Sequence, residues 1–121
     1  MKVERIRALD PPFRLVVARG EVADLRPLYA AADVFVHPTY HDPCSLACLE
    51  ALAMGVPVIT TPRNGVAELM GPRGGIVIEE PGSREALATA LHVLSDPALR
   101  AATAIDARQV ALRHPEVERL D

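Results

Sequence analysis

The feature that most constrains the fold of this chain is an alternation of short apolar runs with longer segments of helical periodicity. The apolar runs, rich in Val, Ile and Leu, cover residues 14–19, 34–37, 57–60 and 76–78. The helical segments cover residues 24–32, 45–54 and 66–70, followed by one helix after Ser83 and a last one after Pro97. Strands that alternate with helices build βαβ units with a parallel sheet. Strands that are apolar throughout are typical of a sheet covered on both faces. We therefore predict an α/β fold with a doubly wound, Rossmann-like parallel sheet.

Local signals support the helix boundaries. Ser83 is a typical N-cap residue, and Leu87, Leu91 and Leu94 follow it at helical spacing. Gly55 stands directly after the helix predicted over 45–54, where a left-handed residue commonly ends a helix. The last helix carries the apolar residues Leu99, Ala102, Ile105 and Leu112.

Length and charge narrow the class of protein. The 121 residues suffice for a single domain over 1–121 with a real core. The net charge of −3 provides no basic surface, so we expect no nucleic-acid partner. No apolar run is long enough to span a membrane, and the N-terminus does not resemble a signal peptide. Two cysteines, Cys44 and Cys48, form no disulfide framework. We expect a soluble, cytoplasmic protein.

The loop and helix around residues 42–54 contain the main candidate binding residues of the chain. Taking Leu46 as a core contact, the predicted buried stripe is Leu46, Leu49, Glu50 and Ala53. A carboxylate on or beside an apolar face needs polar partners, because its burial is otherwise costly. Asp42 lies in the loop that enters the same helix, and Asp42 or Ser45 can cap it. The free N–H groups of the first turn can hold an anion. This arrangement predicts a diphosphate pocket flanked by two carboxylates, which suits a nucleotide sugar.

The same residues resemble a known family. The segment DPCSLACLEALAMGVPVITTPRNGVAELM, with Asp42 and Glu50 separated by seven residues, resembles the acidic pair of retaining GT-B glycosyltransferases of glycosyltransferase family 4. Upstream LYAAADVFVHP and downstream GVPVIT are also similar to that family, so the resemblance extends from about Leu15 to about Arg100. Within that family, the residues Pro43-Cys44-Ser45 and Arg63-Asn64-Gly65 most resemble the bacterial lipopolysaccharide-core glucosyltransferases.

The resemblance implies a role for each matching residue. Asp42 would bind hydroxyls of the donor sugar, and backbone amides around Cys44, Ser45 and Leu46 would face the sugar and the β-phosphate. Glu50 would bind both hydroxyls of the nucleotide ribose. Arg63 and Arg19 are candidates for phosphate and base contacts. The family implies a UDP-hexose donor, transfer with retention to a glycan or lipid-linked acceptor, and no metal cofactor.

Relative to this family we expect the chain to be N-terminally truncated. The paired Arg and Lys that clamp the diphosphate, and the N-terminal Rossmann domain with the acceptor site, have no counterpart before Leu15. We therefore expect the C-terminal half of a GT-B fold that is inactive alone and needs an N-terminal domain or subunit. Its exposed interdomain face could mediate self-association. The complete enzyme would be cytoplasmic, with peripheral association to the inner membrane as one option.

Simpler interpretations stand beside these. Glu50 could be a rim residue that reaches water, and Asp42 could serve only as a helix cap. Turn chemistry alone explains Asn64 and Gly65, and Gly74-Gly75 resembles a phosphate loop only weakly. The whole chain could be a non-catalytic nucleotide-binding or split-subunit module. A zinc site is a further alternative, with ligands His37, His41, Cys44 and Cys48, although the spacing matches no common zinc module.

Overall fold

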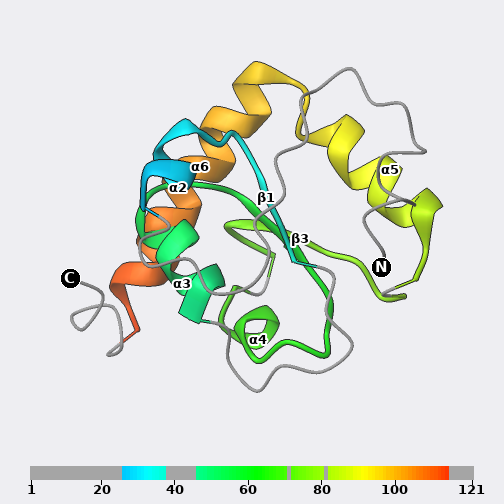
Figure 1. Cartoon of the computed structure of the whole chain (residues 1–121), viewed down its shortest axis with the longest axis horizontal. Coiled ribbons are helices and arrows are strands. Elements are labelled where there is room, and N and C mark those ends of the chain that lie inside the picture. Colours follow the sequence, from blue (N-terminus) through cyan, green and yellow to red (C-terminus); the bar gives the residue numbers. More distant parts are fainter. Residues whose placement is uncertain (1–25, 38–45, 71, 81, 115–121) are drawn as a thin grey trace.

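The computed structural model of the chain describes residues 26–37, 46–70, 72–80 and 82–114 (Figure 1). Within these residues the centre of the fold is a three-stranded parallel sheet in the order β1-β2-β3. The strands are β1 (Phe35–His37), β2 (Val58–Thr60) and β3 (Gly75–Val77). In the register of the sheet, Val58 stands between Phe35 and Gly75. The predicted parallel α/β architecture is therefore confirmed, while the strand predicted over 14–19 lies outside the described residues.

Five helices connect and cover these strands within the described part of the chain. They are α2 (Arg26–Ala31), α3 (Leu46–Ala53), α4 (Val66–Met70), α5 (Arg84–Val93) and α6 (Pro97–Leu112). Each agrees with the corresponding predicted helix to within a few residues. None of these helices is long and apolar enough to cross a membrane.

The central strand divides the core into two layers. Val58 and Ile59 are adjacent, so their side chains leave β2 on opposite faces of the sheet. The Val58 face packs against α2, α3, α4 and α6, whereas the Ile59 face packs against Leu87, Ala90 and Leu94 at and just after α5. Figure 1 shows α5 apart from the group formed by α2, α3 and α6. Helices thus cover both faces, as the doubly wound interpretation requires.

Helix ends follow the local signals. The Ser83 hydroxyl accepts a 3.1 Å hydrogen bond from the Ala86 N–H and begins α5. The Asp96 carboxylate accepts a 2.9 Å bond from the Ala98 N–H and begins α6. Gly55 has a φ of 74° directly after α3, a left-handed conformation that favours glycine. These caps satisfy backbone groups that the helices themselves leave open.

The orientation of α6 differs from the apolar pattern of its sequence. Leu99, Ile105 and Leu112 are 42%, 63% and 70% exposed. Its buried residues are instead Ala107, Val110 and Ala111. The reason is a close approach: a Cβ built on Gly74 would lie 3.1 Å from the Ala107 Cα. Only a face of small residues allows α6 to approach this closely, so its large apolar side chains point away from the core.

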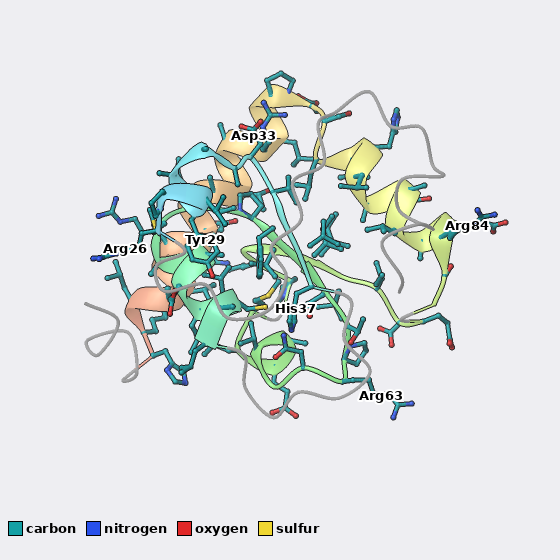
Figure 2. The ribbon with its side chains drawn as sticks, in the orientation of Figure 1. Arg26, Tyr29, Asp33, His37, Arg63 and Arg84 are labelled. Carbon is teal, nitrogen blue, oxygen red and sulfur yellow. The ribbon has the colours of Figure 1, made fainter. Side chains whose placement is uncertain are left out.

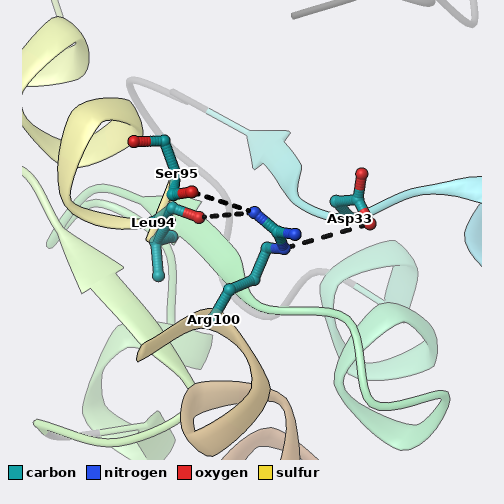
Figure 3. Close-up of polar contacts among 4 residues, drawn as sticks. All are labelled: Asp33, Leu94, Ser95 and Arg100. Carbon is teal, nitrogen blue, oxygen red and sulfur yellow. Dashed lines mark hydrogen bonds and ion pairs between the residues drawn. The ribbon is translucent and has the colours of Figure 1, made fainter. Parts of the chain in front are cut away.

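A polar clamp joins the two layers at the start of α6. Arg100 Nη1 donates to the carbonyl oxygens of Leu94 and Ser95 at 3.2 and 3.4 Å (Figure 3). Arg100 Nε lies 4.0 Å from Asp33 Oδ1, just before β1. The clamp places a positive charge where the C-terminal carbonyls of α5 are concentrated.

Candidate functional site

The carboxyl edge of the sheet is the place where ligands bind in open α/β folds. The last residues of β1 and β2, His37 and Thr60, stand next to each other at this edge. Three candidate residues lie in the described segments that follow these strands: Leu46 and Glu50 on α3, after β1, and Arg63 shortly after β2. The candidates Arg19, Asp42, Cys44 and Ser45 lie outside the described residues, so their roles stay predictions.

The predicted stripe on α3 is wrong in part. Leu46 is 54% exposed rather than a core contact, and Glu50 and Ala53 are half-buried. The buried residues of the helix are Cys48, Leu49, Ala51 and Leu52. The physical reason is that α3 packs on two partners, α6 and the sheet, so its buried arc includes residues between them. Periodicity alone chooses one stripe and misses a helix that is covered from two sides.

Glu50 consequently lies away from the buried arc of α3. Leu46 and Glu50 are four residues apart and share a side of the helix. Glu50 remains only half-buried, which leaves part of its side chain accessible. A carboxylate in this position needs no buried counter-charge and can accept hydrogen bonds from a ligand that approaches α3.

Tyr29 is a buried group whose ionisation Glu50 affects. Its side chain is 3% exposed, and its hydroxyl has no hydrogen-bond partner among the described residues. Burial, and then the negative charges of Glu50 and Cys48, raise the pKa of Tyr29 to about 12. The phenol therefore stays protonated at neutral pH and brings no charge to the site.

Aromatic rings connect this tyrosine to the edge of the sheet. The Tyr29 and Phe35 rings meet edge to face, with centroids 5.6 Å apart. The Phe35 and His37 rings are stacked at 5.9 Å with an interplanar angle of 16°. Figure 2 labels Tyr29 and His37, the two ends of this row. The row extends from α2 to the carboxyl end of β1.

Arg63 and Asn64 follow β2 and have opposite environments. Arg63 is exposed, and Figure 2 shows its side chain pointing away from the body of the protein. Asn64 is fully buried, whereas the sequence pattern predicts only a turn residue at this position. Its amide contacts Cys48, Thr60 and Val66. Sequence reasoning missed this role, because an Asn-Gly pair in a loop predicts a turn and not a buried polar contact.

The glycine pair after α4 serves packing. Gly75 lies against the backbone of Val58, its neighbour in the sheet, and Gly74 has a φ of 80° beside α6. Both glycines are thus explained by close backbone contacts.

The described residues provide no cluster of metal-binding side chains for the zinc alternative. Among the residues that the structure describes, no three His, Cys, Asp or Glu side chains gather into a metal site. Cys48 is fully buried, as expected for a small core residue. His41 and Cys44 lie outside the described residues, so the four-residue zinc set stays untested.

The fold is an α/β domain whose parallel sheet is covered by helices on both faces. The family described as Glycosyl transferases group 1 matches residues 2–96. This chain belongs to the group 1 glycosyltransferases. The resemblance read from the 42–54 segment is therefore confirmed at the level of the family.

Individual relatives agree with this assignment. The lipopolysaccharide glucosyltransferase WaaG of Escherichia coli K12 is 40% identical over 90 residues, which cover 73% of this chain and 24% of WaaG. A GDP-mannose-dependent alpha-mannosyltransferase of Mycolicibacterium smegmatis is 36% identical over 98 residues, covering 78% of this chain and 26% of that enzyme. The chain thus spans about a quarter of the length of these relatives.

Solved structures show the same relationship in three dimensions. The crystal structure of WaaG superposes with a TM-score of 0.69 at 38% identity, over 78% of this chain and 26% of WaaG. The Anabaena protein HepE, solved in complex with UDP and glucose, gives a TM-score of 0.69 at 25% identity, over 81% of this chain and 27% of HepE. The matched part is a Rossmann-like half of a GT-B fold.

Proposed function

We propose that this chain is the donor-binding part of a retaining glycosyltransferase that uses a nucleotide diphosphate sugar, a UDP-hexose. The observation that supports the proposal best is Glu50, a half-buried and partly accessible carboxylate on α3, the helix that follows β1. Glu50 accepts hydrogen bonds from both ribose hydroxyls. Hydrogen bonds to a charged acceptor are stronger than neutral ones, so this contact gives a large share of the nucleotide affinity.

The remaining roles follow the family residue by residue. Asp42 binds hydroxyls of the donor sugar, and the amides around Cys44, Ser45 and Leu46 face the sugar and the diphosphate. The exposed Leu46 fits a helix start that meets a ligand rather than the core. Arg63 and Arg19 contact phosphate or base. The first-turn amides and the helix dipole favour the diphosphate, so no metal is required.

The acceptor and the second half of the site belong to a partner. A glycan or lipid-linked acceptor would bind to an N-terminal Rossmann domain, in the same polypeptide or in a separate subunit. In the complete enzyme the donor domain would operate in the cytoplasm, at the inner membrane if the acceptor is a lipid. A non-catalytic nucleotide-binding module is the second candidate.

Calorimetric titration of the chain with UDP and UDP-glucose, with and without chelator, tests the proposal. We expect saturable binding that chelator does not change. Glu50→Gln should weaken UDP binding by about tenfold or more, because a charged acceptor contributes about 1.5–3 kcal/mol. Glu85→Gln is the matched control, because Glu85 is an exposed glutamate in the first turn of α5. Equal UDP affinity in the parent and Glu50→Gln would contradict the ribose assignment. Binding without sugar transfer after an N-terminal partner is supplied would favour the non-catalytic module.

A further inference from the structure

The buried side chain of Asn64 connects four elements at the carboxyl edge of the sheet. Its Oδ1 accepts a hydrogen bond from the Val66 N–H at 3.1 Å, at the start of α4. Its Nδ2 donates to Thr60 Oγ1 at 3.1 Å, on β2, and to Cys48 Sγ at 3.3 Å, on α3. The backbone N–H can only donate, so it fixes the orientation of the amide and directs Nδ2 toward Thr60 and Cys48.

Thr60 extends the connection to β1. Its hydroxyl donates to the His37 carbonyl oxygen at 2.9 Å, which leaves the oxygen lone pairs to accept from Asn64. Thr60 and Asn64 are both fully buried. We call this set of contacts, from His37 through Thr60 and Asn64 to Cys48 and Val66, the Asn64 hub. Buried polar networks of this kind specify one arrangement of the elements that they join.

The geometry of α3 explains why the hub affects more than stability. Cys48 lies in the first turn of the helix, and Glu50 lies two residues further on. Residues two apart are separated by about 200° around a helix. Cys48 and Glu50 thus lie on nearly opposite sides of α3. A rotation of α3 about its axis that separated Cys48 from Asn64 would also displace the Glu50 carboxylate. The contact between Asn64 and Cys48, on the buried side of α3, therefore restricts rotation of the first turn of the helix.

We propose that Asn64 is a positioning residue that acts through Cys48 to fix the place of the Glu50 carboxylate. This inference depends on the proposed function, in which Glu50 binds the ribose hydroxyls. It assigns to the loop after β2 a role in donor binding that requires no contact with the donor. The hub makes the ribose contact strong because Glu50 is held in place before the ligand arrives.

The alternative is a purely structural hub that stabilises the domain without affecting Glu50 in particular. Both ideas predict lower thermal stability when the hub is broken. They differ in what happens to the ribose contact. A positioning role predicts lower affinity for UDP and unchanged affinity for an analogue that lacks the ribose hydroxyls, such as 2′,3′-dideoxy-UDP.

The experiment measures UDP and 2′,3′-dideoxy-UDP binding to the chain by calorimetry, at a temperature where every variant is folded. Cys48→Ala removes the sulfur acceptor, and Cys48→Ser restores an acceptor at the same place. Asn64→Asp keeps an oxygen for the Val66 N–H but has no N–H donors. We expect Cys48→Ala and Asn64→Asp to weaken UDP binding by about fivefold or more, as contacting residues commonly couple. Both should bind dideoxy-UDP like the parent, and Cys48→Ser should recover the UDP affinity.

Leu87→Ala is the matched control for destabilisation. Leu87 is fully buried on the Ile59 face of the sheet, away from the hub. It should lower the melting temperature and leave UDP affinity unchanged. If Asn64→Asp fails to fold, the Cys48→Ala and Cys48→Ser pair still decides.

The outcomes separate this inference from the proposed function. If Glu50→Gln loses UDP affinity while the hub variants keep it, the positioning role is wrong and the proposed function stands. Equal losses for UDP and dideoxy-UDP in the hub variants would also overturn the positioning role. A parent chain that binds the two ligands equally, or binds neither, would overturn the ribose assignment and the inference together.

Discussion

Gly75 lies so close to Val58, its partner in the sheet, that a Cβ on Gly75 would overlap the carbonyl oxygen of Val58. One residue earlier, Gly74 faces the Cα of Ala107 on α6. The glycine pair therefore lets β3 meet both its neighbouring strand and α6 without side chains between them. A glycine-rich segment in this position reflects backbone contact.

Gly75→Ala should cost about 3 kcal/mol or more of unfolding free energy, because the new methyl group meets backbone that cannot move aside. Gly55→Ala is the comparison. Its Cβ has room, with the nearest atom outside the helix end 3.6 Å away, but its φ of 74° is left-handed. Gly55→Ala should therefore lower the unfolding free energy only by the cost of the left-handed conformation, about 1–2 kcal/mol. Urea unfolding of both variants checks the order, and a milder effect at Gly75 would contradict the packing argument.

Tyr29→Phe should leave the protein as stable as the parent at neutral pH, or more stable. The buried hydroxyl has no hydrogen-bond partner among the described residues, so its removal relieves a desolvation cost of about 1–3 kcal/mol. Chemical unfolding at neutral pH measures this difference. A large loss of stability in the variant would show that the hydroxyl has a partner that matters.

Alkaline pH provides a second test of Tyr29. Its pKa is raised from 10.0 to about 12 in the folded protein, by burial first. Between these values the unfolded chain releases a proton that the folded protein keeps, so stability falls as pH rises from about 10 to about 12. The slope from this one group is at most about 1.4 kcal/mol per pH unit. Tyr29→Phe should show a shallower decline, and an identical decline would contradict the shift.

Arg100→Ala should destabilise the domain by about 1 kcal/mol, because it removes bonds to the Leu94 and Ser95 carbonyl oxygens at the end of α5. Asp33→Asn should change the melting temperature little. The Asp33 side chain is 81% exposed, and exposed ion pairs contribute little to stability. Thermal unfolding at low and high salt distinguishes the two contributions. A larger effect from Asp33→Asn would show that the ion pair, and not the helix end, is the important contact.

The exposed apolar residues of α6 predict self-association through that helix. Ile105 and Leu112 are 63% and 70% exposed, so replacing both with Ser should change the monomer's stability little. If this surface mediates association, sedimentation analysis should show a smaller fraction of dimer at equal concentration. Unchanged sedimentation would place any association elsewhere.

Chelator should leave the melting temperature unchanged if no structural zinc is present. A zinc site built from His37, His41, Cys44 and Cys48 predicts the opposite, because structural zinc contributes directly to folding. Cys48→Ser, in a chelator-free sample, would then lower the zinc content. Metal analysis of the purified chain measures this content directly.

Much of the fold could be predicted because its signals are local. The strand β2 is a short apolar run before a polar loop, and Ser83 and Asp96 begin helices with the side chains that helix starts prefer. Gly55 ends α3 where a left-handed residue is needed. The pairing of Asp42 and Glu50 within a long motif predicted the family. These features depend on residues near one another in the chain, so the amino-acid sequence alone determines them.

Other features depend on which surfaces meet, and only the tertiary structure decided them. Leu46 is exposed and Cys48 is buried because α3 packs between α6 and the sheet. The alanine face of α6 turns inward because Gly74 allows close approach. The sequence predicts Asn64 as a turn residue. In the structure it is the centre of a buried hydrogen-bond network, because β1, β2, α3 and α4 meet around it. Periodicity reports one preferred face of each element, whereas burial depends on every partner that the fold brings to it.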